Sequence, residues 1–152
     1  MLNNQNIFYK KIILIYGVGK SGLSAYKFLK KDNKVITYDD KIKNSIKKII
    51  TINFDYIIIS PGIDISKCKL SKFLKKNTNK IYTDLDIFYN HHKHNNKITI
   101  TGTNGKSTTA KILYEILKRQ RVDVRLVGNI GNPILLEKNI TNKTVFVIEA
   151  SS

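Results

Sequence analysis

Short apolar runs alternate along the chain with stretches in which apolar residues recur at helical spacing. Apolar runs typical of strands occupy residues 11–16, 34–38, 55–60, 97–100, 122–127 and 144–148, with a shorter run at 80–82. Helical spacing is found at residues 23–31, 71–76, 84–88 and 107–119. Because strands and helices alternate, we predict an α/β fold with parallel sheets flanked by helices.

A polar break divides this pattern in two. Residues 91–96 read His-His-Lys-His-Asn-Asn and carry no apolar period, which is typical of a connector. The three histidines lack the cysteine or carboxylate spacing of a metal site, so we interpret the segment as a solvated linker. We therefore predict a Rossmann-like domain over residues 1–90, a linker at 91–96 and the N-terminal part of a P-loop-type ATPase domain over residues 97–152.

The first apolar run leads into a glycine-rich turn. Residues 17–22 read Gly-Val-Gly-Lys-Ser-Gly, which matches the G-x-G-x-x-G pattern between a strand and a helix. Glycines let the backbone approach a phosphate, and the start of a helix offers backbone N–H groups and a positive dipole end. Asp39 and Asp40 follow the second run about twenty residues later, where a carboxylate commonly meets a sugar hydroxyl, and Asp39 is the better candidate. The pattern predicts a site for a diphosphate.

A second candidate segment, Ser60-Pro61-Gly62, ends the third apolar run. Ligands in open α/β sheets gather beyond the carboxyl ends of the strands, where this tripeptide is expected to lie. A Pro-Gly turn without a ligand is the alternative interpretation.

A second phosphate-binding loop follows the linker. Residues 101–108 read Thr-Gly-Thr-Asn-Gly-Lys-Ser-Thr, a variant of the G-x-x-x-x-G-K-[ST] loop in which the first glycine is displaced to Gly102. A lysine at a helix start lies at the unfavourable end of the helix dipole, and an anionic ligand resolves that conflict. Glu149 ends the last apolar run, where P-loop enzymes carry a carboxylate that holds magnesium. The residues predicted to bind ATP are Gly102, Thr103, Asn104, Gly105, Lys106, Ser107 and Thr108, with Lys106 catalytic and Ser107 and Glu149 as Mg²⁺ ligands.

Composition narrows the class of protein further. The formal net charge of +16 suggests a nucleic-acid partner, but only three of the 27 basic residues are arginine, and the lysines are scattered among isoleucine and asparagine. We therefore expect no nucleic-acid partner. Cys68 is the single cysteine, which excludes an intramolecular disulfide. No apolar run is long enough for a membrane span or a signal peptide, so we expect a cytoplasmic protein with no membrane partner.

Five motifs in one order resemble the Mur ligase family across nearly the whole chain. They are Gly-Val-Gly-Lys-Ser-Gly at 17–22, Ser-Pro-Gly at 60–62, Thr-Gly-Thr-Asn-Gly-Lys-Ser-Thr at 101–108, Gly-Asn-Ile-Gly at 128–131 and Glu-Ala-Ser-Ser at 149–152. The first two most resemble the members that add D-glutamate to UDP-N-acetylmuramoyl-L-alanine. The resemblance implies an ATP-dependent and Mg²⁺-dependent amide-bond ligase of peptidoglycan precursor synthesis that acts through an acyl phosphate.

The resemblance also implies where the uridine-nucleotide substrate is held. The residues that it indicates are Val18, Gly19, Lys20, Ser21, Asp39, Asp40, Lys41, Ser60, Pro61, Gly62 and Asn129. Members of the family have three domains, and the resemblance covers the first and about half of the second. We therefore expect that these 152 residues do not ligate by themselves.

Three alternatives compete with this interpretation. One is a neighbouring ligase of the same superfamily, although the complete glycine turn at residues 17–22 argues against the folate enzymes. Another is an NAD-dependent Rossmann oxidoreductase, supported by that turn and Asp39 but opposed by the second phosphate loop. The third is a non-catalytic remnant that binds nucleotide only.

Overall fold

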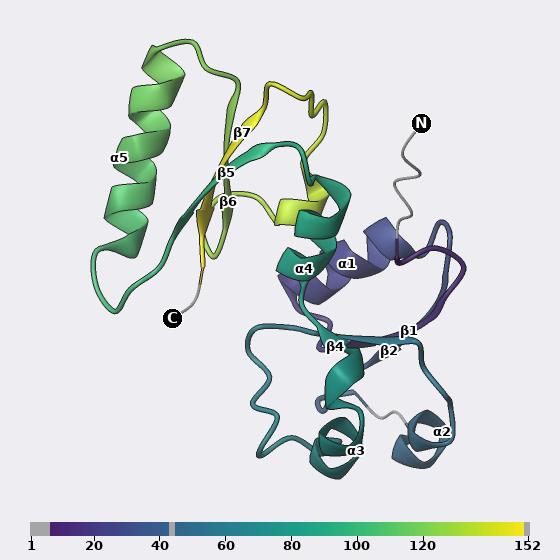
Figure 1. Ribbon diagram of the computed structural model, residues 1–152. Coiled ribbons are helices and arrows are strands. Elements are labelled where there is room, and N and C mark those ends of the chain that lie inside the picture. Colours follow the sequence, from purple (N-terminus) through teal and green to yellow (C-terminus); the bar gives the residue numbers. More distant parts are fainter. Residues whose placement is uncertain (1–6, 43–44, 151–152) are drawn as a thin grey trace. The chain divides into compact units, whose positions relative to one another are not determined.

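The computed structural model describes residues 7–42 and 45–150 and divides into two compact units, Met1–His91 and His92–Ser152 (Figure 1). Each unit contains a parallel sheet covered by helical segments, which agrees with the predicted α/β class. In the described residues no helix is long and apolar enough to cross a membrane.

The sheet of the first unit is doubly wound. Its four strands are all parallel and lie in the order β2-β1-β3-β4, so that β1 has β2 on one side and β3 on the other. In this order the chain switches direction across the sheet between β1 and β3, and ligands of such folds bind beyond the strand ends at that point. The elements are β1 (Ile12–Tyr16), α1 (Lys20–Leu29), β2 (Lys34–Tyr38), α2 (Ile46–Ile50), β3 (Tyr56–Ile59), α3 (Ser71–Lys76), a 3-10 turn (Thr78–Lys80), β4 (Ile81–Tyr82) and α4 (Asp84–His91).

Helices cover both faces of this sheet. Alternate side chains of β1 point to opposite faces, and Leu14 and Tyr16 pack in a core that also contains Ile49 of α2 and Leu74 of α3. On the other face, α1 contacts β1, β2, β3 and α4, and Figure 1 shows α1 and α4 together on that side. This two-sided cover explains why β1 is a continuous apolar run rather than an alternating one.

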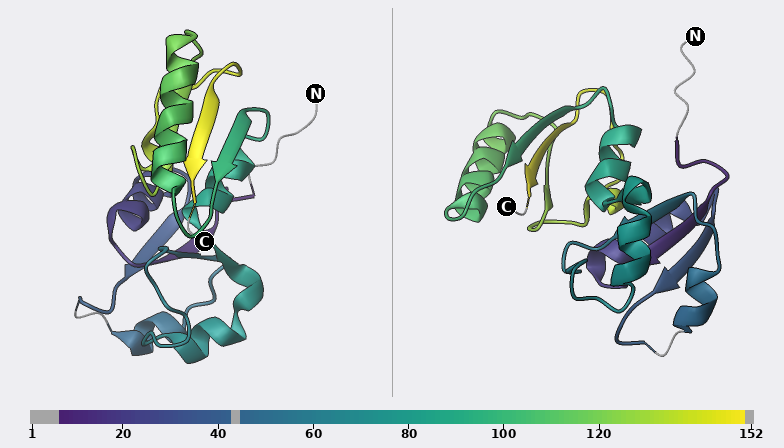
Figure 2. Two further views of the ribbon diagram at one scale, coloured as in Figure 1. Left: turned by 90° about the vertical axis from the view of Figure 1, so that its left-hand side faces the viewer. Right: turned by 60° about the horizontal axis from the view of Figure 1, so that its bottom comes forward.

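The second unit has a three-stranded parallel sheet in the order β5-β7-β6. In register, Ile100 of β5, Glu149 of β7 and Gly128 of β6 lie side by side at the carboxyl end. Ala110 of α5 packs with Val124 and Val147 on one face, and Figure 2 shows α5 along that face. The elements are β5 (Asn96–Ile100), α5 (Lys106–Arg119), β6 (Val124–Gly128), a 3-10 turn (Ile134–Leu136) and β7 (Val145–Glu149).

The structure differs from the predicted elements mainly at their ends. Helix α1 begins at Lys20, three residues before the predicted start, because the glycine turn itself forms its first turn. Helix α2 has no predicted counterpart, since within its five residues only Ile49 is buried and a periodic pattern has no room to develop. Between the two units the turn residues are 92–95, because His91 ends α4 and Asn96 begins β5.

Candidate functional site

The first candidate site lies where β1 and β3 end side by side. Gly17 directly follows β1 and has a φ angle of 92°, in the left-handed region that favours glycine. Its N–H donates to the Tyr38 carbonyl at 2.8 Å, and its carbonyl accepts a hydrogen bond of 2.9 Å from the Ser60 hydroxyl. Ser60 therefore fastens the end of β3 to the glycine turn at the switch point of the sheet.

Helix α1 approaches this turn so closely that only glycine fits at position 22. A Cβ on Gly22 would lie 1.8 Å from the Gly17 carbonyl oxygen. Gly19 and Gly62 are different, because a Cβ on either would meet nothing within 4 Å. Gly22 is thus required by packing, whereas the backbone at Gly19 and Gly62 borders open space in which a ligand can approach.

The two predicted carboxylates hold the loops around this space. Asp39 accepts hydrogen bonds of 2.9 Å from the backbone N–H groups of Val18 and Lys41. These two bonds, with the one from Val18 the larger influence, lower the pKa of Asp39, so its carboxylate remains ionised at neutral pH. Asp40 accepts from the Tyr16 hydroxyl at 2.8 Å and from the Lys69 N–H at 3.2 Å. Both carboxylates therefore brace the loops, and a sugar contact by either remains a prediction.

Asp84 is a residue of this region that the sequence interpretation missed. It is the first residue of α4 and is only 8% exposed. Burial raises the pKa of its carboxyl, while a hydrogen bond with the Ser21 side chain partly offsets this effect. Other residues cap the N-terminus of α4, since the Asp86 carboxylate accepts a hydrogen bond of 2.7 Å from the Thr83 backbone N–H. The acidic start of the predicted helix is a signal for a cap, but only the fold brings Asp84 to Ser21.

The second candidate site is the loop between β5 and α5. Gly105 has a left-handed φ of 76° and immediately precedes α5, which begins with Lys106. The Lys106 ammonium donates to the Gly102 carbonyl at 2.5 Å. The Ser107 hydroxyl lies 3.1 Å from both carboxylate oxygens of Glu149, whose side chain is buried. Two predicted magnesium ligands that are 42 residues apart in sequence thus meet at one edge of the sheet.

The loop after β6 reaches the same edge. The Asn129 N–H donates to the Glu149 carbonyl at 3.0 Å. A Cβ on Gly128 would lie 2.2 Å from that carbonyl oxygen, so the loop runs directly against the end of β7. Asn129 is exposed beside Glu149. Ser151 and Ser152, the last residues of the fifth motif, lie outside the described residues.

The chemistry of these groups fits a hard cation. A hydroxyl and a carboxylate are oxygen ligands, and Mg²⁺ is usually held by one or two carboxylates while water and phosphate oxygens complete its coordination. Within residues 7–42 and 45–150, no group of three His, Cys, Asp or Glu side chains converges as a metal cluster. An ion at Ser107 and Glu149 would thus depend on water or phosphate oxygens for the rest of its coordination.

The remaining predicted site residues lie on the loops around these two centres. In the first unit Lys20, Lys41 and Pro61 are exposed, and Val18 and Ser21 are half-buried. In the second unit Thr103, Asn104 and Thr108 are exposed along the loop and the start of α5. The fold therefore brings the first-unit residues to the ends of β1, β2 and β3, and the second-unit residues to the ends of β5, β6 and β7.

Comparisons with known proteins find similar sequences over nearly the whole chain. Residues 100–152 match the family model of the Mur ligase middle domain. The chain is 36% identical to UDP-N-acetylmuramoylalanine--D-glutamate ligase of Rickettsia bellii over 96% of its own length, and 35% identical to the ligase of that name from Caldicellulosiruptor bescii over 93%. It spans about a third of the length of these relatives, 35% of each.

A solved structure supports the fold. It is the crystal structure of UDP-N-acetylmuramate:L-alanyl-gamma-D-glutamyl-meso-diaminopimelate ligase from Neisseria meningitides, with a TM-score of 0.51 and 14% identity. The similarity covers 95% of this chain and 52% of that one. The motifs, the two parallel-sheet units and the named relatives together establish that the chain belongs to the Mur ligase family.

Proposed function

We propose that the chain is the nucleotide-binding portion of an ATP-dependent ligase that joins D-glutamate to UDP-N-acetylmuramoyl-L-alanine. The observation that carries the proposal is the meeting of Ser107 and Glu149 beside the loop that contains Lys106. The choice of D-glutamate and of the uridine substrate rests on the names of relatives that are 30–36% identical.

The first unit is proposed to bind the uridine nucleotide. Its diphosphate would approach the backbone at Gly19, where the side of the turn is open, and the start of the ten-residue helix α1 contributes N–H groups and a positive dipole end. Asp39 keeps the Val18 and Lys41 backbones in place, and Ser60 keeps the neighbouring strand end in place. The loop is therefore held in shape before a ligand arrives, which lowers the entropic cost of binding.

The second unit is proposed to bind ATP with Mg²⁺. The ammonium of Lys106 and the N–H groups at the start of α5 are the local positive charges that face the loop. The first turn of α5 has no acidic residue that would oppose a phosphate. Ser107 and Glu149 would hold the ion, which when bound neutralises charge on the phosphoryl group that is transferred.

The reaction proposed for the complete enzyme has two steps. The terminal phosphoryl group of ATP passes to the carboxylate of UDP-N-acetylmuramoyl-L-alanine, which gives an acyl phosphate and ADP. The amine of D-glutamate then attacks the acyl carbon, an amide bond forms, and phosphate leaves. Lys106 would stabilise the charge that develops on the phosphoryl oxygens, so the contribution of the chain is positioning and electrostatics.

Calorimetry on the 152-residue chain tests the proposal. UDP-N-acetylmuramoyl-L-alanine, ATP with Mg²⁺ and NAD are titrated separately. We expect binding of the uridine substrate, and binding of ATP that weakens when Mg²⁺ is removed. Binding of NAD alone would overturn the proposal in favour of an oxidoreductase.

Two matched variants assign each ligand to its loop. Gly19→Ala adds a Cβ that meets no protein atom within 4 Å, so we expect a lower affinity for the uridine substrate and an unchanged affinity for ATP. Ser107→Ala is expected to remove the Mg²⁺ dependence of ATP binding, whereas Thr109→Ala, an exposed hydroxyl two positions along the same helix, leaves it intact. Equal effects of the two hydroxyl deletions would contradict the assignment of the metal site.

A further inference from the structure

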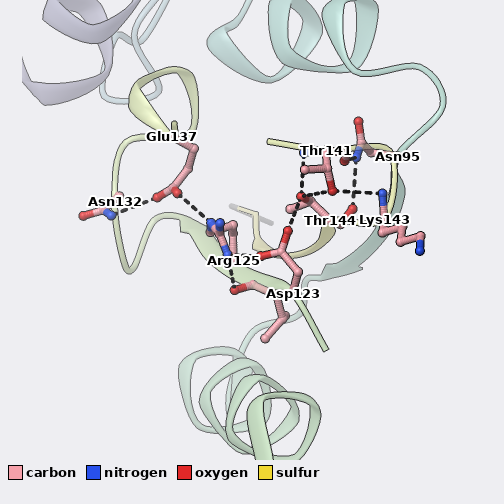
Figure 3. Close-up of polar contacts among 9 residues, drawn as sticks. Asn95, Asp123, Arg125, Asn132, Glu137, Thr141, Lys143 and Thr144 are labelled. Carbon is pink, nitrogen blue, oxygen red and sulfur yellow. Dashed lines mark hydrogen bonds and ion pairs between the residues drawn. The ribbon is translucent and has the colours of Figure 1, made fainter. Parts of the chain in front are cut away.

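An arginine, Arg125, is the second residue of strand β6 in the second unit. Val124 and Leu126 pack in the core beneath α5, so the alternation of side chains along a strand directs Arg125 to the opposite face of the sheet. Arg125 is half-buried there and forms ion pairs with Glu137, at 3.4 Å between Nε and Oε2, and with Asp123. Figure 3 shows the guanidinium between these two carboxylates.

Glu137 connects Arg125 to the loop that follows β6. Its side chain is only 8% exposed. Its Oε1 accepts a hydrogen bond of 2.8 Å from the Asn132 side chain. The Asn132 backbone also forms an isolated β-bridge with Val127, the residue before the last one of β6. The Glu137 carboxylate thus holds the guanidinium with one oxygen and the loop residue with the other, as Figure 3 shows.

The other side of Arg125 is anchored at the start of the strands. Asp123 directly precedes β6 and accepts a hydrogen bond of 2.5 Å from the Thr144 hydroxyl, which directly precedes β7. The Thr144 carbonyl in turn accepts a hydrogen bond of 3.0 Å from the Asn95 side-chain amide. The contacts therefore run from the amino edge of the sheet, through Arg125, to the loop at its carboxyl edge.

That loop carries Asn129. The backbone N–H of Asn129 donates to Glu149, and Gly128 lies against the same residue. A displacement of the loop would consequently move Asn129 and alter the support of the strand end that carries the Glu149 carboxylate.

We propose that Arg125 is a positioning residue that acts through Glu137 and Asn132 to fix the loop 128–133, and thereby Asn129, at the ligand-facing edge of the second unit. The part of this inference that concerns ligand affinity rests on the proposed function and on the expectation, implied by the resemblance to the Mur ligase family, that Asn129 contacts the uridine substrate. The part that concerns loop position does not depend on any ligand.

The test replaces Arg125 by methionine in the 152-residue chain. Arg125→Met keeps an unbranched side chain but removes the guanidinium group that pairs with the carboxylates of Asp123 and Glu137. Because it leaves Glu137 buried without a cation, the paired variant Arg125→Met with Glu137→Gln removes the charge as well. Arg119→Met is the matched control, since Arg119 ends α5 at an exposed position and the same charge is lost.

Amide hydrogen exchange gives the readout that does not need a ligand. We expect faster exchange of the Asn129 amide in Arg125→Met and in the paired variant, while the amides of β7 retain their protection. A purely structural role would lower protection throughout the unit instead. Unchanged exchange at Asn129, or loss that is uniform across β7 and the loop, overturns the inference.

A double-mutant cycle with UDP-N-acetylmuramoyl-L-alanine gives the functional readout. Replacing residues that orient metal ligands changes metal affinity or activity by about 10- to 100-fold, and by analogy we expect about a tenfold loss of substrate affinity here. Arg125→Met should add no further loss of affinity to Asn129→Ala, because coupled residues are not additive. Additive losses overturn the inference. If the wild-type chain does not bind this substrate, the proposed function fails for the substrate, and the exchange experiment still decides the inference.

Discussion

Gly22→Ala is the substitution whose effect the structure of the first unit defines most sharply. An alanine Cβ at this position would lie 1.8 Å from the Gly17 carbonyl oxygen and 3.0 Å from the Ser60 hydroxyl oxygen. Real Cβ atoms do not approach other atoms within 3.0 Å, so α1 and the turn would have to separate by about 1.2 Å, from 1.8 to 3.0 Å. The neighbour is backbone, which cannot swing away as a flexible side chain can.

Two opposing terms set the magnitude. Overpacking that forces a backbone shift costs about 3 kcal/mol, the upper part of the usual range, because the backbone of the turn must open. Alanine is a better helix former than glycine by about 1 kcal/mol, which offsets part of this cost. The net loss is about 2 kcal/mol, and for a unit of this size it lowers the melting temperature by roughly 8–16 °C.

Near-ultraviolet circular dichroism of tyrosine measures this loss. The chain has no tryptophan and 8 tyrosines, of which only Tyr114 lies in the second unit. The tyrosine signal therefore reports mainly on the first unit during thermal unfolding.

Gly19→Ala is the control for the same turn. Gly19 has a φ of −68°, which alanine adopts readily, and its Cβ would meet no atom within 4 Å. We expect its stability to change by less than about 1 kcal/mol. If Gly22→Ala melts at the wild-type temperature, or if both variants lose the same stability, the close approach of α1 to the turn is wrong.

Three further predictions concern charge and backbone conformation. Burial raises the pKa of Asp84 above its ordinary 3.8, so the folded state pays for its ionisation as pH rises from 3.8 to the folded value, and that cost is fully present above the folded value. Asp84→Asn should therefore stabilise the first unit at pH 7, and urea denaturation should show the gain vanish as pH falls below 3.8; destabilisation at pH 7 would contradict this. The pKa of Asp123 is lowered, first by the Thr144 hydroxyl and then by Arg125. The ionised Asp123 carboxylate therefore stabilises the second unit above pH 3.8, and this stabilisation is lost as pH falls through the pKa of Asp123 in the folded state. Asp123→Asn should destabilise the second unit at pH 7 and match the wild type in acid; a difference in stability that does not depend on pH would refute this. Gly105→Ala should lower the free energy of unfolding of the second unit by about 1–2 kcal/mol because of the left-handed backbone, and Gly105→Asn by less; equal losses in chemical denaturation would argue against that conformation.

The sequence predicted the strands and the loops after them because glycines and buried runs act locally. Residues 13–16 are buried on both faces of the strand, which only a doubly covered sheet requires. Glu149 could be assigned a place at a strand end, and because carboxyl ends of parallel strands share an edge, its approach to Ser107 follows from the pattern. The exact ends of α1 and β6 could not be predicted, because helix and strand ends depend on which backbone groups find partners.

Other features depend on side chains that are distant in sequence. Asp39 and Asp40 are adjacent, yet Asp39 receives backbone N–H groups of the glycine turn while Asp40 binds Tyr16 and Lys69. Nothing in a pair of neighbouring aspartates distinguishes these roles, since the difference comes from which distant segments the fold places beside each carboxylate.

By itself the sequence determined the α/β class and predicted a polar connector and two glycine-rich loops that each join a strand to a helix, because local glycine conformations and apolar periods carry that information. The binding of phosphate by these two loops stays a prediction. Only the tertiary structure decided that Asp84 is buried beside Ser21 and that Arg125 reaches Glu137 and thereby Asn132. The physical reason is that burial and ion pairing are set by which elements pack together, and the order of strands in each sheet, not the order of residues in the chain, fixes that packing.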